Sequence, residues 1–232
     1  MPLTAPPATV QAYAATLHAT ETARADAFFH EGDRLRYIVA HGALRGVLGG
    51  YLGCAPVDVE LEHRAAGKPV LVAPLHLHFS LSHGGATGLL AVAADRSVGV
   101  DVEHVANVHH PHAIARRWFS AREAQLLVGA EPGRAATSFL RLWTAKESCV
   151  KETGAGLAAL PEVVVAADGR HASDATRRWS LSAVPVWRDH VATLAVQGVR
   201  PVLAVRPLRH AATPAELAVS AQIDAHAAGV SA

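Results

Sequence analysis

A pattern of three short apolar segments occurs twice in this chain, about one hundred residues apart. The first set covers residues 79–82, 90–92 and 98–101, and the second covers residues 179–182, 194–196 and 202–205. Each set predicts three consecutive strands, and helical patterns precede each set, over about 33–52 in the first half and about 112–128 and 134–152 in the second. We therefore expect an α+β fold of two similar lobes related by a pseudo-twofold repeat, each a mainly antiparallel sheet packed with a long helix.

The predicted lobes meet near a proline- and histidine-rich stretch, residues 104–112. We place an N-terminal lobe at residues 1–105, a C-terminal lobe at residues 106–210 and a C-terminal tail at residues 211–232. Histidines surround Pro111 in the stretch between the lobes, but no cysteine or histidine partners stand at zinc-site spacing. We interpret this stretch as a solvated linker.

Composition excludes several classes of function. With 232 residues, half of them hydrophobic, the chain can bury a core without disulfides. A net charge of +1 provides no strongly basic face for duplex nucleic acid. The N-terminus lacks the basic start of a signal peptide, and the longest apolar stretch, residues 88–94, is too short to cross a bilayer. We expect a cytoplasmic monomer with no nucleic-acid or membrane partner; Cys54 and Cys149 alone make no disulfide framework.

An acidic pair interrupts an apolar strand pattern at residues 98–103. Three valines at alternate positions face one way, so Asp101 and Glu103 face the other. Two carboxylates about 7 Å apart along a strand can converge on one hard cation. The alternative is a sheet with one solvated face, which produces the same alternation.

A second polar pattern lies in the predicted helix at residues 143–151. Helical spacing of i, i+4 and i+8 places Trp143, Glu147 and Lys151 on one face. By itself the Glu147 and Lys151 pair fits an ordinary surface ion pair. Together with the acidic strand, it indicates a binding site for a metal-bound phosphate.

The two halves of the repeat differ where chemistry is expected. Asp101 is matched by Val205, Glu103 by Pro207 and His83 by Ala183. Polar residues that only one copy keeps are not needed for the fold of a lobe. If the lobes pack about a pseudo-twofold axis, the Glu147 helix faces the strand of Asp101 and Glu103, and three carboxylates meet in an interlobe cleft.

Residues 98–103 (Val-Gly-Val-Asp-Val-Glu) and 143–151 (Trp-Thr-Ala-Lys-Glu-Ser-Cys-Val-Lys) resemble the two signature motifs of the 4′-phosphopantetheinyl transferases. The length and the internal repeat resemble the larger, two-lobed type that activates surfactin synthetase. The resemblance runs from about residue 24 to about residue 208.

The resemblance implies an enzyme that transfers the 4′-phosphopantetheine arm of coenzyme A to a serine of an apo acyl carrier protein or of a peptidyl or polyketide carrier domain. It implies Mg²⁺ as cofactor, with Mn²⁺ as the alternative, and release of adenosine 3′,5′-bisphosphate. By similarity Asp101, Glu103 and Glu147 hold the metal. Glu147 takes the serine proton, directly or through a metal-bound water, and Lys151 stabilises the leaving diphosphate.

Further matches imply residues that bind coenzyme A. Residues 67–69 (Gly-Lys-Pro) resemble the segment where the adenine rests, which assigns Lys68 to the donor. The resemblance also assigns donor-binding roles to five more residues: Arg45, Ser82 and His83 around the 3′-phosphate, Asp101, and Lys146 beside Lys151. Arg24 matches a basic position more weakly. The segment 119–123 resembles one whose glutamate, here Glu123, lies near the metal.

Two other interpretations use the same residues. A metal-dependent phosphohydrolase or nuclease also uses carboxylates and a lysine, but it needs a poised water in place of the carrier serine. A degenerate relative that only binds coenzyme A or a carrier domain is the non-enzymatic alternative. The sequence departs from the family at Glu21, where some relatives are basic, and in the Gly84-Gly85 pair after His83. It does not identify the carrier protein or the tolerance for acyl-coenzyme A.

Overall fold

The computed structural model describes residues 1–64, 66–74, 76–128 and 134–208. These residues form two compact units. The first contains residues 1–60, 86–88 and 207–208, and the second contains residues 61–85 and 89–206. The expected boundary after residue 105 falls inside the second unit, and nearly all of the expected tail lies outside the described residues.

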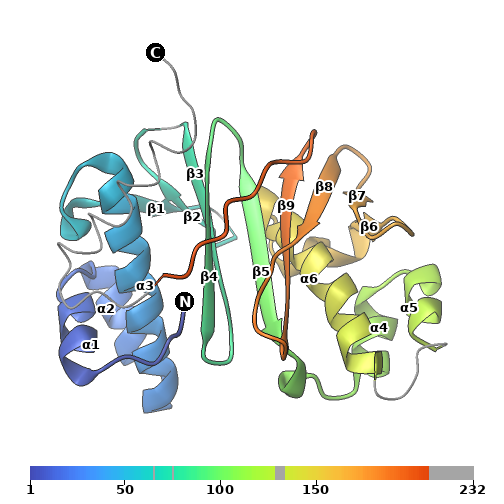
Figure 1. Ribbon diagram of the computed structural model, residues 1–232, viewed down its shortest axis with the longest axis horizontal. Coiled ribbons are helices and arrows are strands. Elements are labelled where there is room, and N and C mark those ends of the chain that lie inside the picture. Colours follow the sequence, from blue (N-terminus) through green and yellow to red (C-terminus); the bar gives the residue numbers. More distant parts are fainter. Residues whose placement is uncertain (65, 75, 129–133, 209–232) are drawn as a thin grey trace. The chain divides into compact units, whose positions relative to one another are not determined.

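The first unit is helical. It contains α1 (Pro7–Ala14), α2 (Ala19–Asp26), α3 (Glu31–Leu52) and the 3-10 helix η1 (Pro56–Asp58) (Figure 1). The helix expected over 33–52 is present as α3, which ends at Gly53 in the left-handed conformation (φ 67°) that glycine adopts without strain. Glu21 caps α2 by accepting a hydrogen bond from the His18 amide.

The second unit is built on antiparallel strands. A hairpin joins β1 (Leu61–His63) and β2 (Pro69–Leu71), and another joins β3 (Leu77–Gly84) and β4 (Thr87–Ala94). A five-stranded sheet has the order β5-β9-β8-β7-β6. Its strands are β5 (Val98–His104), β6 (Val164–Val165), β7 (His171–Ser173), β8 (Arg178–Ala183) and β9 (His190–Gln197).

The helices of the second unit include α4 (Pro111–Trp118), α5 (Ala121–Val128) and α6 (Ala135–Thr153). Short 3-10 helices, η2 (Val105–Asn107) and η4 (Leu157–Glu162), link them to the strands. The sequence predicted one helix over 112–128, but the chain breaks it at Phe119, which is extended. Ser120 then starts α5, because Ser120 and Glu123 exchange hydrogen bonds as a capping box.

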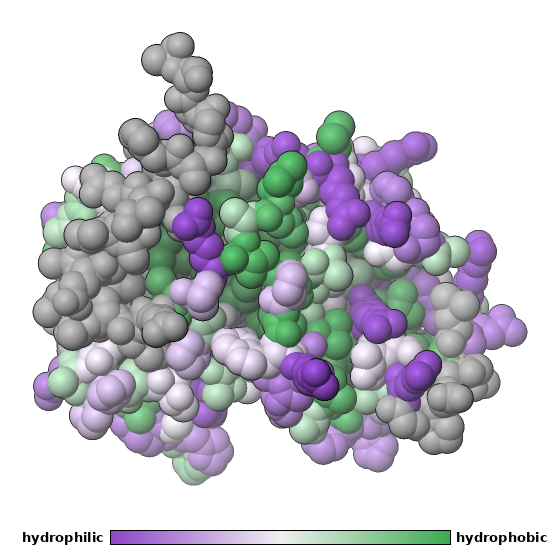
Figure 2. All heavy atoms as spheres, in the orientation of Figure 1, coloured by the Kyte–Doolittle hydropathy of each residue, from purple (hydrophilic) through white to green (hydrophobic). Residues whose placement is uncertain are grey.

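The five-stranded sheet is buried on both faces. On one face α6 packs against β5, β9 and their neighbours, with Cys149, Trp179 and Leu181 in the shared core. On the other face Val98, Val100 and Val102 of β5 pack with β4 and β9 residues, and Leu203 of the C-terminal segment lies against this cluster. Figure 2 shows hydrophobic side chains gathered over the strands labelled β4, β5 and β9 in Figure 1.

Two serines join β3 to β5, which belong to different sheets. The Val100 amide donates to the Ser80 hydroxyl (3.1 Å), and the Val102 amide donates to the Ser82 hydroxyl (3.3 Å). Buried amides need such acceptors wherever a backbone ladder is interrupted. These serines therefore fasten β3 beside β5.

The structure does not confirm the two-lobe repeat. Residues 201–208 form no strand, and the Val202 side chain is fully exposed. Instead β5 pairs with β9 in one sheet, with Val100 opposite Leu194 and His104 opposite His190. The last strand of the first predicted set thus fills the place expected of residues 202–205. No helix among the described residues is both long and apolar enough to cross a membrane.

Replacing Gly99 by alanine is expected to weaken the contact between α6 and β5. A Cβ at this position would overlap the Ser148 carbonyl oxygen and the Glu152 amide nitrogen, both of which belong to backbone. Overpacking of this kind costs about 1–3 kcal/mol or more, so the melting temperature should fall by several degrees. Gly32→Ala is the control, since a Cβ there meets only the flexible Arg36 side chain. Equal melting temperatures for the two variants would contradict the tight contact.

Candidate metal and anion site

Three carboxylates converge between β5 and α6. Gly99, Asp101 and Glu103 project from β5 toward α6, while the intervening valines face the opposite core. Asp101 is 2% exposed and Glu147 is 8% exposed, so the alternative of a solvated sheet face does not apply. The alternation inferred from the sequence is therefore present, and its polar side is covered by the helix that carries Glu147.

The carboxylates oppose one another's ionisation. Burial, and then the Asp101 charge, raise the pKa of Glu147 to about 7. Burial raises the pKa of Glu103 to about 7 as well, with further contributions from Asp101 and Glu147. Buried carboxyls that repel one another in this way are stabilised by a cation.

Lys151 supplies one positive charge to this group. Its ammonium donates to Asp101 Oδ1 (2.6 Å) and to the Ser82 hydroxyl (2.9 Å). The Ser82 hydroxyl donates to the same carboxylate oxygen at 2.8 Å. Asp101 Oδ1 is thus fully engaged, whereas the buried Oδ2 has no hydrogen-bond partner within the described residues.

The residues present fit a hard divalent cation. A buried carboxylate oxygen with no hydrogen-bond partner in the described part of the chain stands near two further carboxyls whose ionised forms are only partly compensated, by Lys151, and oxygen ligands of this kind suit Mg²⁺. Three such ligands are fewer than the coordination number of Mg²⁺, which usually keeps waters or phosphate oxygens as well. The three carboxylates do not all lie within 4.8 Å of one another.

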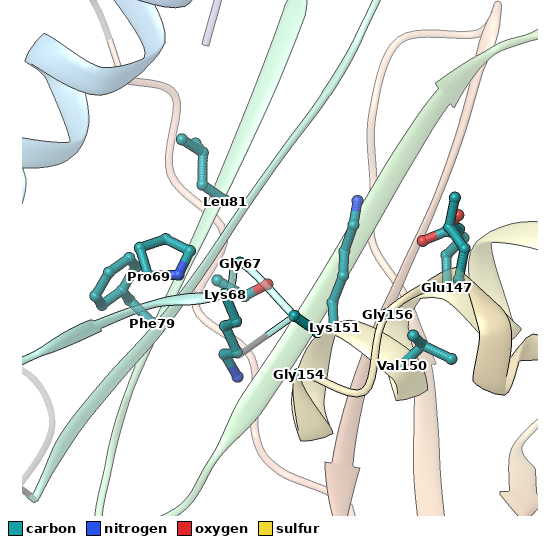
Figure 3. Close-up of a pocket in the computed structure, with 13 residues that line it drawn as sticks. Gly67, Lys68, Pro69, Phe79, Leu81, Glu147, Val150, Lys151, Gly154 and Gly156 are labelled. Carbon is teal, nitrogen blue, oxygen red and sulfur yellow. The ribbon is translucent and has the colours of Figure 1, made fainter. Parts of the chain in front are cut away.

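A pocket of about 310 Å³ opens beside this group (Figure 3). Glu147, Val150 and Lys151 of α6 form one wall, and Figure 3 shows Glu147 and Lys151 projecting in the same direction from the helix. Facing residues come from the Gly67-Lys68-Pro69 segment and from residues 79–81 of β3. The structure thus brings the Gly-Lys-Pro segment and the signature helix to one cavity.

Apolar residues of this pocket were missed by the sequence analysis. Phe79, Leu81 and Leu157 line it, and Leu157 is 52% exposed. Phe79 and Leu81 were identified only as strand residues, because apolar character in a strand also fits a core position. An apolar wall beside charged groups suits a ligand with both an anionic and an uncharged part.

The Lys68 ammonium does not point into the pocket but binds backbone carbonyl oxygens behind its wall. Its ammonium donates to the carbonyl oxygen of Glu152 (2.7 Å) and lies 3.3 Å from that of Val98. In Figure 3 it points away from the Lys151 ammonium. Burial lowers the pKa of Lys68 to about 8. A cation on the last-turn carbonyls stabilises a helix C-terminus, and here it fastens the β1–β2 hairpin to α6.

Lys146, a predicted donor-binding residue, is buried and forms an ion pair with Glu123. The Lys146 side chain is 0% exposed and donates to Glu123 and to the Val163 carbonyl oxygen. Glu123 also accepts the Val165 amide, and these bonds lower its pKa even though burial opposes them. Lys146 and Glu123 therefore tie α6 to α5 and β6. Trp143 packs on Phe139, so its indole belongs to the core of the unit.

Arg45 has a comparable place in the first unit. It is 1% exposed, pairs with Glu21 at 2.6 Å and donates to the carbonyl oxygens of Pro56 and Val59. Burial raises the pKa of Glu21, but hydrogen bonds from His41, His18 and Arg45 outweigh it and bring the pKa to about 2. The departure at Glu21 noted in the sequence thus supplies a partner for Arg45.

His83 lies at the end of β3 and is exposed, next to the buried Ser82. Gly84 follows it because a Cβ there would overlap the Val102 carbonyl oxygen. The His83 side chain thus contacts solvent, whereas the Ser82 side chain points toward Asp101 and Lys151.

A second polar cluster combines His104, Asp189 and His190. Asp189 accepts from both imidazoles, at 2.9 and 2.7 Å. The other nitrogen of His104 accepts a hydrogen bond from the Ala106 amide, and that of His190 is buried with no hydrogen-bond partner in the described part of the chain. Metal-binding histidines usually donate this second N–H to an acceptor. The cluster is therefore better described as two histidines bridged by one carboxylate.

Comparisons with known proteins agree on one family. The family model described as the 4′-phosphopantetheinyl transferase superfamily matches residues 97–195, a range that includes all three carboxylates and Lys151. The 4′-phosphopantetheinyl transferase HetI of a Nostoc strain is 36% identical over 203 residues, which cover 85% of this chain and 86% of HetI. The transferase Sfp of Bacillus subtilis is 28% identical over 130 residues, covering 56% of this chain and 57% of Sfp.

Among solved structures, holo-[acyl-carrier-protein] synthase of Thermotoga maritima matches 45% of this chain and 64% of its own, with 18% identity and a TM-score of 0.33. The match to HetI extends over most of both proteins and continues beyond the range of the family model. On that relationship, and with both signature motifs in one site, the chain belongs to the 4′-phosphopantetheinyl transferase superfamily, in its larger, Sfp-like type.

Proposed function

We propose that this protein transfers the 4′-phosphopantetheine arm of coenzyme A to a serine hydroxyl of an apo acyl, peptidyl or polyketide carrier protein, with release of adenosine 3′,5′-bisphosphate. The observation that carries the proposal is the placement of Asp101, Glu103, Glu147 and Lys151 in one group beside the pocket. Family membership supports the same reaction.

Asp101, Glu103 and Glu147 are the proposed ligands of Mg²⁺, with Mn²⁺ as an alternative. When bound, such an ion neutralises diphosphate charge and favours departure of the nucleotide. Asp101 offers its unpartnered Oδ2, while Ser82 and Lys151 hold Oδ1. Glu103 and Glu147 offer carboxylates that are poorly compensated without a cation.

Glu147 and Lys151 are the proposed catalytic residues. Glu147 has a pKa near neutrality and lines the pocket, which suits a base that accepts the serine proton directly or through one water. The Lys151 side chain lines the same pocket and has a flexible stem, so its ammonium can reach a diphosphate oxygen as negative charge grows on it.

The pocket and His83 are the proposed contacts of coenzyme A. The Gly67-Lys68-Pro69 segment and the apolar wall suit the adenosine or pantetheine portion, and the exposed His83 suits the 3′-phosphate. Lys68 contributes its backbone and stem, since its ammonium is engaged with carbonyl oxygens. We leave Arg45 and Lys146 out of the proposed contacts because their charged groups are buried in ion pairs.

We further propose that the protein acts as a monomer in the cytoplasm. The two cysteines form no disulfide, which fits a reducing compartment. A net charge of +1 gives no reason to expect a nucleic-acid partner.

Product analysis distinguishes the transferase from a phosphohydrolase. Incubation with coenzyme A and Mg²⁺ should yield adenosine 3′,5′-bisphosphate only when an apo carrier is present, and the carrier mass should rise by one phosphopantetheine group. Nucleotide release without a carrier would instead support a hydrolase. Absence of both products with several carriers would support a protein that only binds the donor or the carrier.

Glu147→Gln and Asp101→Asn should each lower kcat by at least about 100-fold, because a lost charge leaves the diphosphate uncompensated. Both changes preserve side-chain size, so circular dichroism should remain native. Glu162→Gln removes an exposed carboxylate from the same unit and should keep wild-type kcat. A variant with near-native turnover at saturating Mg²⁺ would remove that residue from the catalytic set.

Mg²⁺ should stabilise the protein more at about pH 8 than at about pH 5. The folded-state pKa values of Glu103 and Glu147 lie near 7, above the ordinary value of 4.5. The folded state therefore holds protons that the unfolded state has lost between these values, so without metal the two groups lower stability as pH rises through this window. Bound Mg²⁺ compensates the ionised carboxylates. Thermal melting with and without Mg²⁺ measures the difference, and an equal shift at both pH values would contradict it.

His83→Ala and Lys151→Ala should affect different kinetic constants. His83→Ala should raise KM for coenzyme A and matter far less with dephospho-coenzyme A, which lacks the 3′-phosphate. Lys151→Ala should lower kcat with either form of coenzyme A, because the loss of a hydrogen-bond donor from the transition state costs roughly 3–4 kcal/mol. The comparison requires measurable wild-type use of dephospho-coenzyme A. Equal losses with both donors for His83→Ala would end its assignment to the 3′-phosphate.

A further inference from the structure

Lys151 forms the centre of a closed hydrogen-bonded triangle. Its ammonium, the Ser82 hydroxyl and Asp101 Oδ1 are joined by three bonds of 2.6 to 2.9 Å. The three residues come from α6, β3 and β5, all within the second unit. The lysine is thus not directed freely into the pocket; it pairs with a carboxylate proposed to hold the metal.

The charge of Lys151 extends to all three carboxylates. It pairs with Asp101, and its positive charge lowers the pKa values of both Glu103 and Glu147 against the opposing effect of burial. One monovalent cation therefore partly compensates a group with three ionisable carboxyls. The same group is the proposed ligand set of a divalent ion, so the two cations compete for the same negative charge.

The two members of the pair differ in their freedom to move. The Asp101 side chain is 2% exposed and lies on β5 beneath α6, whereas the Lys151 side chain is 32% exposed and lines the pocket. A lysine side chain has a flexible four-carbon stem, so its ammonium can change direction at a small cost in free energy. Asp101 stays in place while Lys151 is able to turn toward a ligand in the pocket.

We propose that Lys151 is a resident counter-ion that exchanges partners during binding. Before metal and donor bind, it partly compensates the charge of the carboxylates; when a divalent ion takes over Asp101, the ammonium is released to the diphosphate of the donor. This inference rests on the proposed function and adds a property to it: Lys151 opposes metal binding in the absence of donor. A lysine that only contacted the diphosphate would leave donor-free metal affinity unchanged.

The test is Mn²⁺ binding without coenzyme A, measured by electron paramagnetic resonance of the free ion and by calorimetry. Lys151→Met should bind Mn²⁺ at least about fivefold more tightly than wild type, because a positive charge beside the ion is removed. Lys151→Gln serves as a second uncharged variant if the methionine variant folds poorly. Arg141→Met removes an exposed positive charge from the same helix, and its affinity should equal that of wild type.

The outcomes separate this inference from the proposed function. Glu147→Gln should weaken Mn²⁺ binding in the wild-type background and in the Lys151→Met background, which assigns the ion to the carboxylates. If Glu147→Gln has no effect, the proposed metal site is wrong. If Glu147→Gln weakens binding but Lys151→Met and Lys151→Gln bind Mn²⁺ as wild type does, the metal site stands and the counter-ion exchange is overturned. If Arg141→Met increased the Mn²⁺ affinity as much as Lys151→Met does, the counter-ion exchange would likewise be overturned, since the effect would then reflect only the lower net positive charge.

Discussion

The close backbone contact between α6 and β5 is the constraint on which the site depends. At Gly99 the absence of a Cβ lets the Ser148 carbonyl and the Glu152 amide lie directly over the strand. Glu147 and Lys151 directly precede these two contact residues on the helix, and Asp101 lies two residues along on the same face of the strand. A helix held even a little farther away would not bring the Lys151 ammonium to 2.6 Å from a carboxylate that projects from β5. The geometry of the charged groups is therefore a consequence of backbone packing.

The same helix carries two lysines with opposite environments. Lys146 is completely buried, and its ion pair with Glu123 is closed by further hydrogen bonds to backbone groups. Lys151, little more than one turn later, also pairs with a carboxylate, but its side chain remains partly exposed and lines a pocket. Removing one partner of a closed, buried pair leaves an uncompensated charge and mainly costs stability. A pair at the edge of a pocket can exchange partners with a ligand, and for that reason Lys151, and not Lys146, is the proposed catalytic lysine.

The first-half helix and the acidic strand were predictable because their patterns are local. The 22 residues of α3 and the alternation at 98–103 follow helical and strand periodicity that tertiary contacts do not override. The two-lobe repeat is not confirmed, for a non-local reason: the segment at 202–205 has strand composition, but β5 already pairs with β9 where the third strand was expected. Apolar composition alone does not show which partner a strand finds.

By itself the sequence determined the family, the type of chemistry and the residues of the acidic strand and signature helix, because motif spacing places Asp101, Glu103, Glu147 and Lys151 on defined faces. Only the tertiary structure decided where each long side chain ends. Arg45, Lys68 and Lys146 carry the right charge for an anion site, yet their cationic groups bind Glu21, backbone carbonyls and Glu123. The physical reason is reach: a lysine or arginine stem spans several ångströms, so its charged end is positioned by neighbours from other elements and not by its own place in the chain.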